Sequence, residues 1–399
     1  MPATLATVAS ILKEIYEPQV REQLENRTVA LKRIERSSDG IETNVGGKYV
    51  TFPIHTRRNS GIGARNEMEL LPTPGQQGYN AGRVNLKFQY GGIQVTGQMV
   101  ELADKNYQAF SNALDQEIKG LKNDLGKDLN RQVYGNGTGT LATVTADGAN
   151  TVTVADTMYL QLGMQVDIVD GTTLAAATPT VKVSNRQITA INTTTGVVTY
   201  SGADGTAVAG DVITRTGNGN REWTGLGAII RNSGTIYNID PNVEPSWVAQ
   251  VDTSGGNRAV SEGLMISMAD QIQTAGGKVT AIFGNLGVRR AYWNLLSQQR
   301  QYVNTQEFTG GFKGLAFVTD QGEIPFVSDT DAPKNTMLFV NEDELTLYRE
   351  GEWSWMDRDG SMFQRVIGYD AYEARMYQYS EIGCHRRNSF GIIDKLTEG

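Results

Sequence analysis

Residues 103–137 read ADKNYQAFSNALDQEIKGLKNDLGKDLNRQVYGNG and contain the clearest periodic pattern in the chain. Its apolar residues recur at steps of three or four, the spacing of one helix face, at Phe110, Leu114, Ile118, Leu121, Leu125, Leu129 and Val133. The pattern predicts a helix of about nine turns over 103–134, ended by the helix-breaking run Gly135-Asn136-Gly137. Gly120 and Gly126 each disfavour this helix by about 1 kcal/mol relative to alanine, so packing against other segments must hold it.

The segments before this helix predict two extensions. Residues 4–36 have the apolar spacing of a helical arm, with too few apolar residues to fold alone. Two strand-like runs follow, Tyr49–Thr56 and Arg83–Thr96, in which apolar and polar residues alternate. We expect these runs to pair as a long hairpin around residues 57–82. Because a two-stranded hairpin is marginally stable alone in water, it must gain burial from another domain or another subunit.

The composition changes abruptly between Thr140 and Thr216. This segment has 18 threonines, nine charged residues and no glutamate among 77 positions. Short alternating apolar runs recur about every ten residues between Gly, Asp and Asn, which predicts five or six short strands in a small β-barrel or sandwich. Gly-rich sequences flank the segment on both sides, as expected for a domain inserted into an exposed turn.

The remainder of the chain has a mixed α/β pattern. We expect helices over Val260–Ile272 and Gly287–Gln301, and a short strand opened by Pro245. Further strands are expected at Lys278–Phe283, Leu315–Thr319, Glu323–Val327, Met337–Val340 and Glu344–Tyr348. The aromatic-rich stretch from Phe363 to Phe390 is also strand-like.

Composition excludes several functional classes. The 399 residues carry 36 Lys and Arg against 44 Asp and Glu, a net charge of -8, which disfavours tight sequence-specific nucleic-acid binding. One cysteine and two histidines exclude an intrachain disulfide framework and a His/Cys metal cluster. The N-terminus lacks the basic region of a signal peptide, and no apolar run is long enough to span a membrane. We therefore expect a soluble protein of a reducing cytoplasm, without cofactor or metal.

Motifs for catalysis are weak throughout. Neither Gly47-Lys48 nor Gly277-Lys278 is followed by the hydroxyl residue of a phosphate loop, and no GxSxG elbow occurs. We interpret Cys384 as a buried inert thiol and His385 as a surface or interface residue. Two groups of residues leave open a β-rich carbohydrate-binding or hydrolytic protein. We expect turn roles for the aspartates, which are Asp329, Asp331, Asp357 and Asp359. We expect packing roles for Trp353 and Trp355.

The order of these segments resembles the major capsid proteins of tailed bacteriophages, which have the Hong Kong 97-type fold. An N-terminal arm and a hairpin similar to the family's E-loop precede QVTGQMVELADKNYQAFSNALDQEIKGLKNDLGKDLNRQVYGNGTG (94–139), which resembles the strand and spine helix of the peripheral domain. The stretches PSWVAQVDTSGGN (245–257) and GEIPFVSDTDAPKNTMLFVNEDELTLY (322–348) are similar to the axial domain, and GYDAYEARMYQYSEIGCHRRNSFGII (368–393) to the last peripheral strand.

The resemblance implies an α+β fold with the following division. Residues 1–40 form the N-terminal arm, 41–90 the extended hairpin or E-loop, and 91–139 the peripheral domain with its spine helix. Residues 140–217 form the inserted all-β domain, 218–335 the axial domain, and 336–399 return to the peripheral domain. The inserted domain is additional to the shared fold.

The resemblance also implies a structural, non-enzymatic function. The expected protein self-assembles into hexamers and pentamers of an icosahedral shell that encloses double-stranded DNA. It is part of the virion and is assembled in the cytoplasm of a bacterial host, without membrane contact. Its expected partners are copies of itself, a separate scaffolding protein, a portal protein, optionally a decoration protein, and packaged DNA through non-specific contact. An encapsulin-like nanocompartment that encloses protein cargo remains the alternative with the same fold.

Candidate contact residues follow from these expectations. We expect intersubunit ion pairs around the hairpin among Arg57, Arg58, Arg65, Glu67 and Glu69, the alternative being ordinary solvated loop charges. Basic residues of the arm are the candidates to face the genome: Lys32, Arg33 and Arg36. Relatives that cross-link covalently use a hairpin lysine, and residues 57–86 contain none, so we expect a shell without isopeptide bonds.

Overall fold

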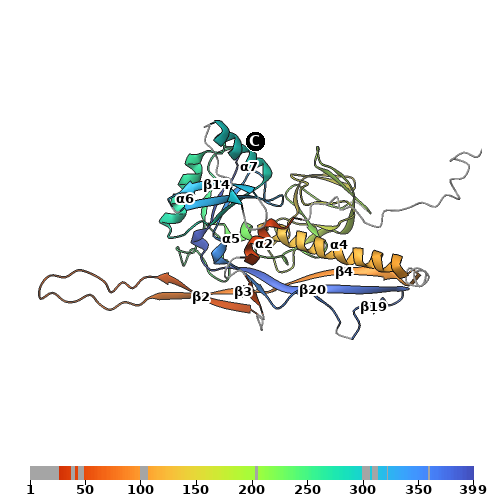
Figure 1. The fold of residues 1–399 in the computed structure, drawn as a ribbon, viewed down its shortest axis with the longest axis horizontal. Helices are drawn as coiled ribbons and strands as arrows, with labels where there is room; N and C mark the ends of the chain where they lie inside the picture. Colours follow the sequence, from red (N-terminus) through yellow and green to blue (C-terminus); the bar gives the residue numbers. More distant parts are fainter. Residues whose placement is uncertain are drawn as a thin grey trace, which may run out of the picture.

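The computed structural model describes residues 27–36, 41–43, 49–98, 107–202, 205–298, 306–307, 313–320, 322–357 and 360–399. In Figure 1 a narrow hairpin extends from a body in which a long helix lies along two paired strands. An α/β part and a separate barrel lie above this helix in the same view. No helix in the described ranges is both long and apolar enough to cross a membrane.

The helix predicted first is α4, Tyr107–Tyr134, which lies along the strands β4, Lys87–Thr96, and β20, Ala371–Cys384. These two strands pair antiparallel from Ala371 opposite Thr96 to Ser380 opposite Lys87. A side chain at Gly91 would place its Cβ 2.8 Å from a methyl group of Leu125. Glycine at this position therefore lets the helix approach the sheet closely.

The peripheral sheet has six strands. Strand β20 is its centre and pairs with strands from distant parts of the chain: β17, Leu345–Arg349; β18, Ser354–Trp355; and β19, Gln364–Arg365. Strand β1, Ile41–Thr43, extends the sheet by parallel pairing with β17. The arm helix α2, Val29–Arg36, packs against α4 and β17 and buries Ala30 and Ile34. The arm residues 4–26 lie outside the described ranges.

The hairpin is formed by β2, Tyr49–Arg57, and β3, Gly78–Asn85. The sequence-based expectation that Arg83–Thr96 is the partner of the first strand is wrong beyond Asn85. Residues 78–85 pair with β2, whereas residues 87–96 form β4 and pair with β20. Apolar and polar residues alternate both before and after Leu86. This alternation identifies the residues that form strands, but it does not show which partner strand each of them pairs with.

The threonine-rich segment folds as a closed six-stranded barrel. Its strands are β5, Ala142–Gly148; β6, Thr151–Val154; β7, Gln165–Val169; β8, Val181–Asn192; β9, Val197–Tyr200; and β10, Val212–Arg215. Alternate residues of these strands fill its own apolar core, among them Val144, Val152 and Ile188. Closure leaves no free strand edge among these six strands.

The α/β part is built on a seven-stranded sheet in the order β11-β21-β16-β12-β15-β14-β13. The strands are β11, Gln250–Asp252; β12, Ala281–Gly284; β13, Gln306–Glu307; β14, Lys313–Thr319; β15, Gly322–Ser328; β16, Met337–Val340; and β21, Gly391–Ile393. Helices α6, Glu262–Thr274, and α7, Leu286–Gln298, cover one face. The strand expected to open at Pro245 begins only at Gln250, because residues 245–249 form a turn that buries Trp247.

The short helix α5, Leu226–Ile229, and two 3-10 turns, η1, Glu342–Glu344, and η2, Arg387–Ser389, complete the described elements. One apolar core joins the arm helix, the hairpin root, the end of α4 and the second face of the α/β sheet, through residues such as Ile34, Phe52, Val133 and Phe283. The body is therefore a composite in which the arm and the hairpin root are part of a shared core.

Candidate functional site

The tip of the hairpin is the most exposed apolar surface of the described chain. Ile62, Met68, Leu70 and Leu71 are 82%, 100%, 90% and 77% exposed, and the loop that carries them lies far from the body (Figure 1). Clusters of this kind on a soluble protein mark interaction sites, because leaving them in water forgoes the free energy of burying apolar area. The tip is therefore a candidate contact with another molecule.

The hairpin loop is held in shape by its own polar contacts. Arg65 Nε donates to the carbonyl oxygen of Leu70 at 2.9 Å, and Asn66 donates from its backbone and side chain to Glu69. These bonds from Asn66 lower the pKa of the Glu69 carboxyl. Two of the five predicted contact residues, Arg65 and Glu69, thus bind within the loop.

A narrow neck separates the loop from the paired strands. A Cβ at Gly61 would lie 2.5 Å from the backbone nitrogen of Gly75, so the two sides of the loop approach at distances that only glycine allows. Arg58 and Glu67, the remaining predicted residues of the loop, are exposed. They are free to contact solvent or a neighbouring molecule.

The root of the hairpin is anchored in the body. Arg57 Nη2 lies 2.8 Å from Glu244 Oε1, and this hydrogen bond lowers the pKa of Glu244. The Phe52 ring packs edge-on against Tyr237 and His385, with centroids 6.1 Å and 4.9 Å away. The predicted contact residue Arg57 therefore has a partner in its own chain.

His385 and Cys384 lie at this root. Tyr348 Oη and His385 Nε2 are 2.8 Å apart. Cys384 is fully buried, and burial raises the pKa of its thiol. His385 follows the last residue of β20, and its ring packs against Phe52 and Tyr348. The structure agrees with an inert, buried cysteine.

The structure describes the side chains of two of the three basic arm residues. Lys32 is exposed, whereas Arg33 binds both carboxylate oxygens of Glu342 at 2.5 Å and 2.7 Å. The side chain of Arg36 lies outside the described part of the chain. The expectation that Lys32, Arg33 and Arg36 face the genome stays a prediction. Within the chain, Arg33 joins the arm to the turn η1.

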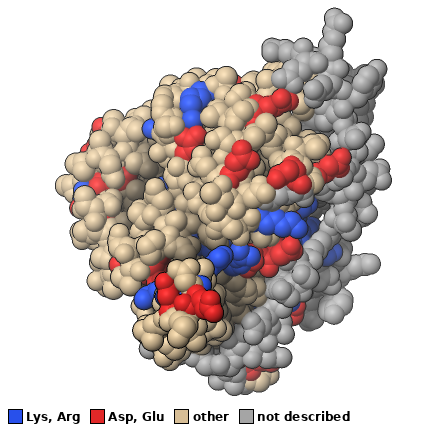
Figure 2. Space-filling model, turned by 90° about the vertical axis from the view of Figure 1, so that its left-hand side faces the viewer, with Lys and Arg blue, Asp and Glu red and all other residues tan. Residues whose placement is uncertain are grey.

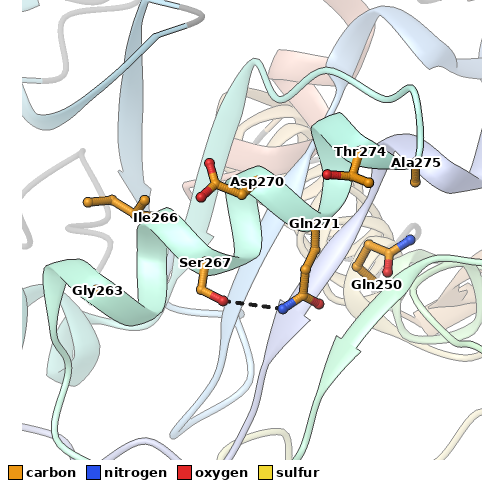
Figure 3. A pocket seen from close by; sticks show the side chains of 8 residues that line it. All are labelled: Gln250, Gly263, Ile266, Ser267, Asp270, Gln271, Thr274 and Ala275. Atoms are coloured by element: carbon orange, nitrogen blue, oxygen red, sulfur yellow. Dashed lines mark hydrogen bonds between the residues drawn. The ribbon is translucent and has the colours of Figure 1, made fainter.

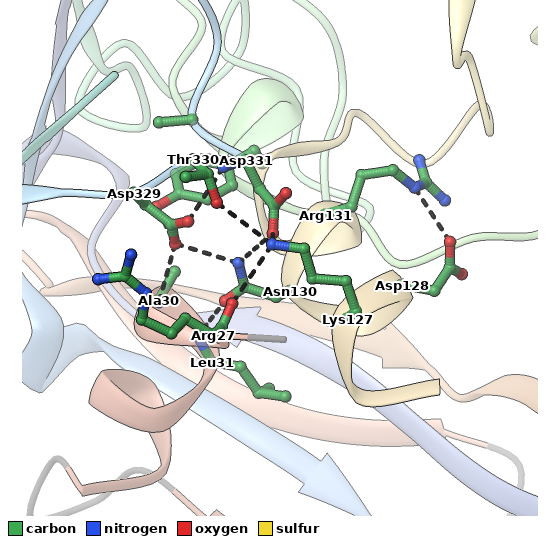
Figure 4. A network of polar contacts seen from close by, with 12 residues as sticks. Arg27, Ala30, Leu31, Lys127, Asp128, Asn130, Arg131, Asp329, Thr330 and Asp331 are labelled. Atoms are coloured by element: carbon green, nitrogen blue, oxygen red, sulfur yellow. Dashed lines mark hydrogen bonds and ion pairs between the residues drawn. The ribbon is translucent and has the colours of Figure 1, made fainter. Parts of the chain in front are cut away.

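A buried polar network joins the arm, the long helix and the α/β part (Figure 4). Asp329 accepts hydrogen bonds from Ala30 N at 3.2 Å, Asn130 Nδ2 at 3.1 Å and Tyr134 Oη at 3.0 Å. Asn130 also accepts from Leu31 N at 3.1 Å. Sequence reasoning placed Asp329 in a turn, which is correct because its Oδ1 accepts from Asp331 N. The network itself was not predicted, because its donors Ala30 and Asn130 lie about 300 and 200 residues from Asp329 in the sequence.

A second carboxylate extends the network. Asp331 Oδ2 lies 2.6 Å from Asn130 Nδ2 and 2.9 Å from Lys127 Nζ. Burial raises the pKa of Asp331, although Asn130 and Lys127 act in the opposite direction. Both oxygens of Asp329 and one oxygen of Asp331 are thus engaged within the chain, which favours a structural role for this pair over the acid and base roles of a hydrolase.

The other residues of the carbohydrate-binding alternative are also dispersed. Trp353 packs against the main core, Trp355 pairs on β18 with Met376, and Asp357 is exposed. Asp359 lies outside the described residues. Among the residues that the structure describes, no group of three His, Cys, Asp or Glu could hold a metal ion.

Four aromatic rings share the face of the peripheral sheet that points away from α4. The register places Phe88 opposite Tyr379 and Tyr90 opposite Tyr377. The Phe88 and Tyr379 centroids are 4.9 Å apart, and those of Tyr377 and Tyr379 are 5.2 Å apart. Phe88 and Tyr90 are exposed, so this face is a second candidate contact surface.

A groove of about 580 Å³ runs along the outer side of α6 (Figure 3). Most of the residues that line it have polar side chains, and Gln271 Nε2 donates to Ser267 Oγ at 3.3 Å within it. Figure 2 shows the molecule from the side on which α6 and the hairpin lie in Figure 1, with acidic side chains more widespread than basic ones. The groove is open and lacks the enclosed apolar lining of a small-molecule site.

Comparisons with known proteins indicate a structural protein, which agrees with the exposed contact surfaces described above. A family model described as SU10 major capsid protein matches residues 88–397. The chain belongs to the SU10 major capsid protein family. No curated protein matches the sequence. The function of a major capsid protein is structural, and its location is the capsid of the virion.

Solved structures similar to this capsid protein come from several sources. The cyanophage A-1(L) capsid asymmetric unit contains a chain that is 14% identical, with 99% of this chain and 100% of that chain covered and a TM-score of 0.64. The capsid of an empty GTA particle is 9% identical, with 99% and 98% covered and a TM-score of 0.53. The Microbacterium phage Oxtober96 protein is 8% identical, with 98% of each chain covered and a TM-score of 0.51. These likenesses confirm the predicted α+β capsid fold.

One buried acid gives this capsid protein a testable pH dependence. Glu381 is buried on β20, where Oε1 accepts from Thr224 N at 2.7 Å and from Ile382 N at 3.1 Å. Burial raises the pKa of Glu381 to about 8, from 4.5. Between these pH values the folded state keeps a proton that the unfolded state has lost, so the free energy of unfolding falls as pH rises, by at most roughly 1.4 kcal/mol per pH unit.

We expect Glu381→Gln to remove this slope, because the amide oxygen can accept the same two backbone bonds without titrating. Urea unfolding at several pH values between 5 and 8 measures how the free energy of unfolding changes with pH. Glu373→Gln, on the same strand but next to the exposed Arg375, is the matched control and keeps the parent slope. Equal slopes in the parent and the Glu381 variant would contradict a protonated buried Glu381.

Proposed function

We propose that this capsid protein self-assembles into hexamers and pentamers of an icosahedral shell that encloses double-stranded DNA. The observation that carries the proposal is the exposed apolar tip of the hairpin, with Met68 and Leu70 almost fully exposed at the end of an extension that has no apolar layer of its own. Association with further copies buries this surface. Membership of a major capsid protein family supports other copies of the chain as the partner.

The contacts proposed for the hairpin combine apolar and charged groups. Its apolar tip covers an exposed surface of a neighbouring copy, and Arg58 and Glu67 form intersubunit ion pairs beside it. Each pair contributes about 0–1 kcal/mol but recurs in every subunit. Arg57, Arg65 and Glu69 contribute indirectly, because their contacts orient the root and the loop.

The proposed interior contact with DNA is non-specific. A net charge of -8 disfavours a wall that grips phosphates through counterion release. Lys32 and Arg36 are the proposed basic contacts of the arm. The proposed partners are a separate scaffolding protein, a portal protein and optionally a decoration protein, with assembly in the bacterial host cytoplasm and without isopeptide cross-links.

Electron microscopy of the purified particles tests this function. We expect closed shells of uniform size that contain nuclease-protected DNA when isolated from an infected host, and a single band near 43.5 kDa after boiling and reduction. Shells filled with a protein cargo would instead indicate an encapsulin-like nanocompartment. Monomers under all conditions, with binding to immobilised polysaccharide, would favour the carbohydrate-binding alternative. A ladder of covalent oligomers would contradict the absence of cross-links.

A further inference from the structure

The inserted barrel is bonded directly to the α/β part. Tyr159 lies between strands β6 and β7, and its hydroxyl donates to the carbonyl oxygen of Asp331 at 2.7 Å. Burial raises the pKa of this hydroxyl, so Tyr159 stays a neutral donor. A second, more exposed link joins Asp156 and Lys334 at 2.8 Å. The barrel thus touches the same turn that forms the buried network.

The barrel is also bonded to α4. Arg215, at the end of β10, places its Nε 3.1 Å from Asp128 Oδ1, and Arg131 Nε lies at the same distance from that oxygen. The guanidinium of Arg131 also lies 6.0 Å from the centre of the Tyr159 ring, within the range of a cation–π contact. Arg131 further binds Glu222, just beyond the barrel, at 2.7 Å.

The third side of this arrangement joins α4 to the α/β part through Lys127, Asn130 and Asp331. The barrel, α4 and the α/β part therefore each contact the other two. A cavity of about 170 Å³ lies where they meet and is lined by Lys127, Arg131 and Tyr159 among others. Among the described residues the apolar core of the barrel is a cluster separate from the main core. The polar bonds around this cavity are therefore the contacts that a variant can remove to test the joint.

The apolar contact between α4 and the α/β part lies nearer the end of the helix. Tyr134 packs edge-on to Phe283 with ring centroids 6.3 Å apart. Asp128 precedes Tyr134 by six residues, which is about 9 Å along a helix. This contact and the bonds of Lys127 and Asn130 to Asp331 form a direct joint between α4 and the α/β part, and the bonds of the barrel to Asp128 and to the Asp331 carbonyl brace that joint through a second path.

We propose that the inserted barrel is a strut that fixes the angle between the long helix α4 and the α/β part of the same chain. The strut acts through Tyr159 on the α/β side and Arg215 on the helix side. This goes beyond the proposed shell function, since it concerns the shape of a single subunit. If the shell forms as proposed, a fixed angle between α4 and the α/β part limits the angles at which neighbouring copies can meet in the shell.

A pair of spin labels measures this angle in the full-length, unassembled subunit. Lys119 on α4 and Ser267 on α6 are exposed, and each is replaced by cysteine for labelling. The native Cys384 is fully buried and does not react in the folded protein. Tyr159→Phe/Arg215→Gln removes the two bonds through which the strut is proposed to act and keeps the ring and the barrel core. The Asp156–Lys334 pair stays in place, but it is solvent-exposed and therefore a weak restraint. We expect its distance distribution to broaden about two-fold relative to the parent, as for domains released from a fixed contact.

The control is Tyr200→Phe/Arg186→Gln, which makes the same chemical changes elsewhere in the barrel. It is expected to keep the parent distribution. Circular dichroism and the thermal midpoint establish that each variant is folded. A folded Tyr159/Arg215 variant with a distribution as narrow as that of the parent overturns the strut. If the unsubstituted protein failed to form shells, the proposed function would be contradicted. The spin-label distances would still test the strut, because they are measured in the unassembled subunit.

Discussion

Replacing Leu70 and Leu71 with glutamate is expected to abolish shell formation and to leave the subunit folded. Both side chains lie at the hairpin tip and are 90% and 77% exposed, so neither contributes to the core of the single chain. In a shell the tip becomes buried, and two carboxylates placed there are desolvated without a partner. An uncompensated buried charge costs several kcal/mol, and the cost recurs at every copy.

Sedimentation and electron microscopy of the variant measure this outcome. We expect particles to be lost entirely while the circular dichroism spectrum and the unfolding midpoint of the subunit stay unchanged. Leu162→Glu provides the matched control, because Leu162 is an equally apolar exposed residue, 67% exposed, on the barrel. It is expected to assemble normally. Normal particle yields from the double tip variant would remove the hairpin tip from the assembly contacts.

Asp329→Ala is expected to lower the free energy of unfolding of the subunit by about 3–5 kcal/mol, the range for breaking a buried polar network by removal of one partner. Asp329 is 1% exposed and accepts bonds from Ala30 N, Asn130 Nδ2 and Tyr134 Oη. Alanine leaves Ala30 N and Tyr134 Oη buried without this acceptor, whereas Asn130 Nδ2 keeps its bond to Asp331. The loss also detaches the arm helix, because the bond to Ala30 satisfies a backbone donor in its first turn.

Chemical denaturation of the unassembled subunit measures this change, and hydrogen exchange of residues 29–36 reports the release of the arm. Asp357→Ala is the control, since Asp357 is an exposed aspartate that follows β18 of the peripheral sheet, and its loss is expected to change the free energy of unfolding by less than about 0.5 kcal/mol. A comparably small effect of Asp329→Ala would mean that water replaces the lost oxygen and that the network is not a structural joint.

Local patterns predicted the individual elements well. The period of the apolar residues before Gly135 gave the end of α4 at Tyr134, and the apolar run Met337–Val340 is strand β16 to the residue. Both succeed because an element with one buried face repeats its apolar residues at its own helical or strand period. The hairpin was predicted as an extension for a similar reason, since the loop between its strands has no apolar period.

Pairing across the chain could not be predicted in this way. The residues 87–96 read as part of the hairpin because alternation is the same in any strand, and only the approach of β20 decides that they leave it. Among the candidate contact residues, Arg57 and Arg33 were identified by charge alone. Their partners, Glu244 and Glu342, lie 187 and 309 residues away, and no local signal marks such a pair.

Local patterns in the amino-acid sequence predicted the elements of this protein and the threonine-rich insertion, and the resemblance of their order to a known family predicted its capsid fold. Tertiary structure alone decided which side chains became joints. Asp329 and Asp331 have the sequence of an ordinary turn, and they became a buried link only because α4, the arm and the barrel converge on them. Periodicity reports which face of an element is buried, whereas a polar joint depends on the distance between elements, which is set when the whole chain packs.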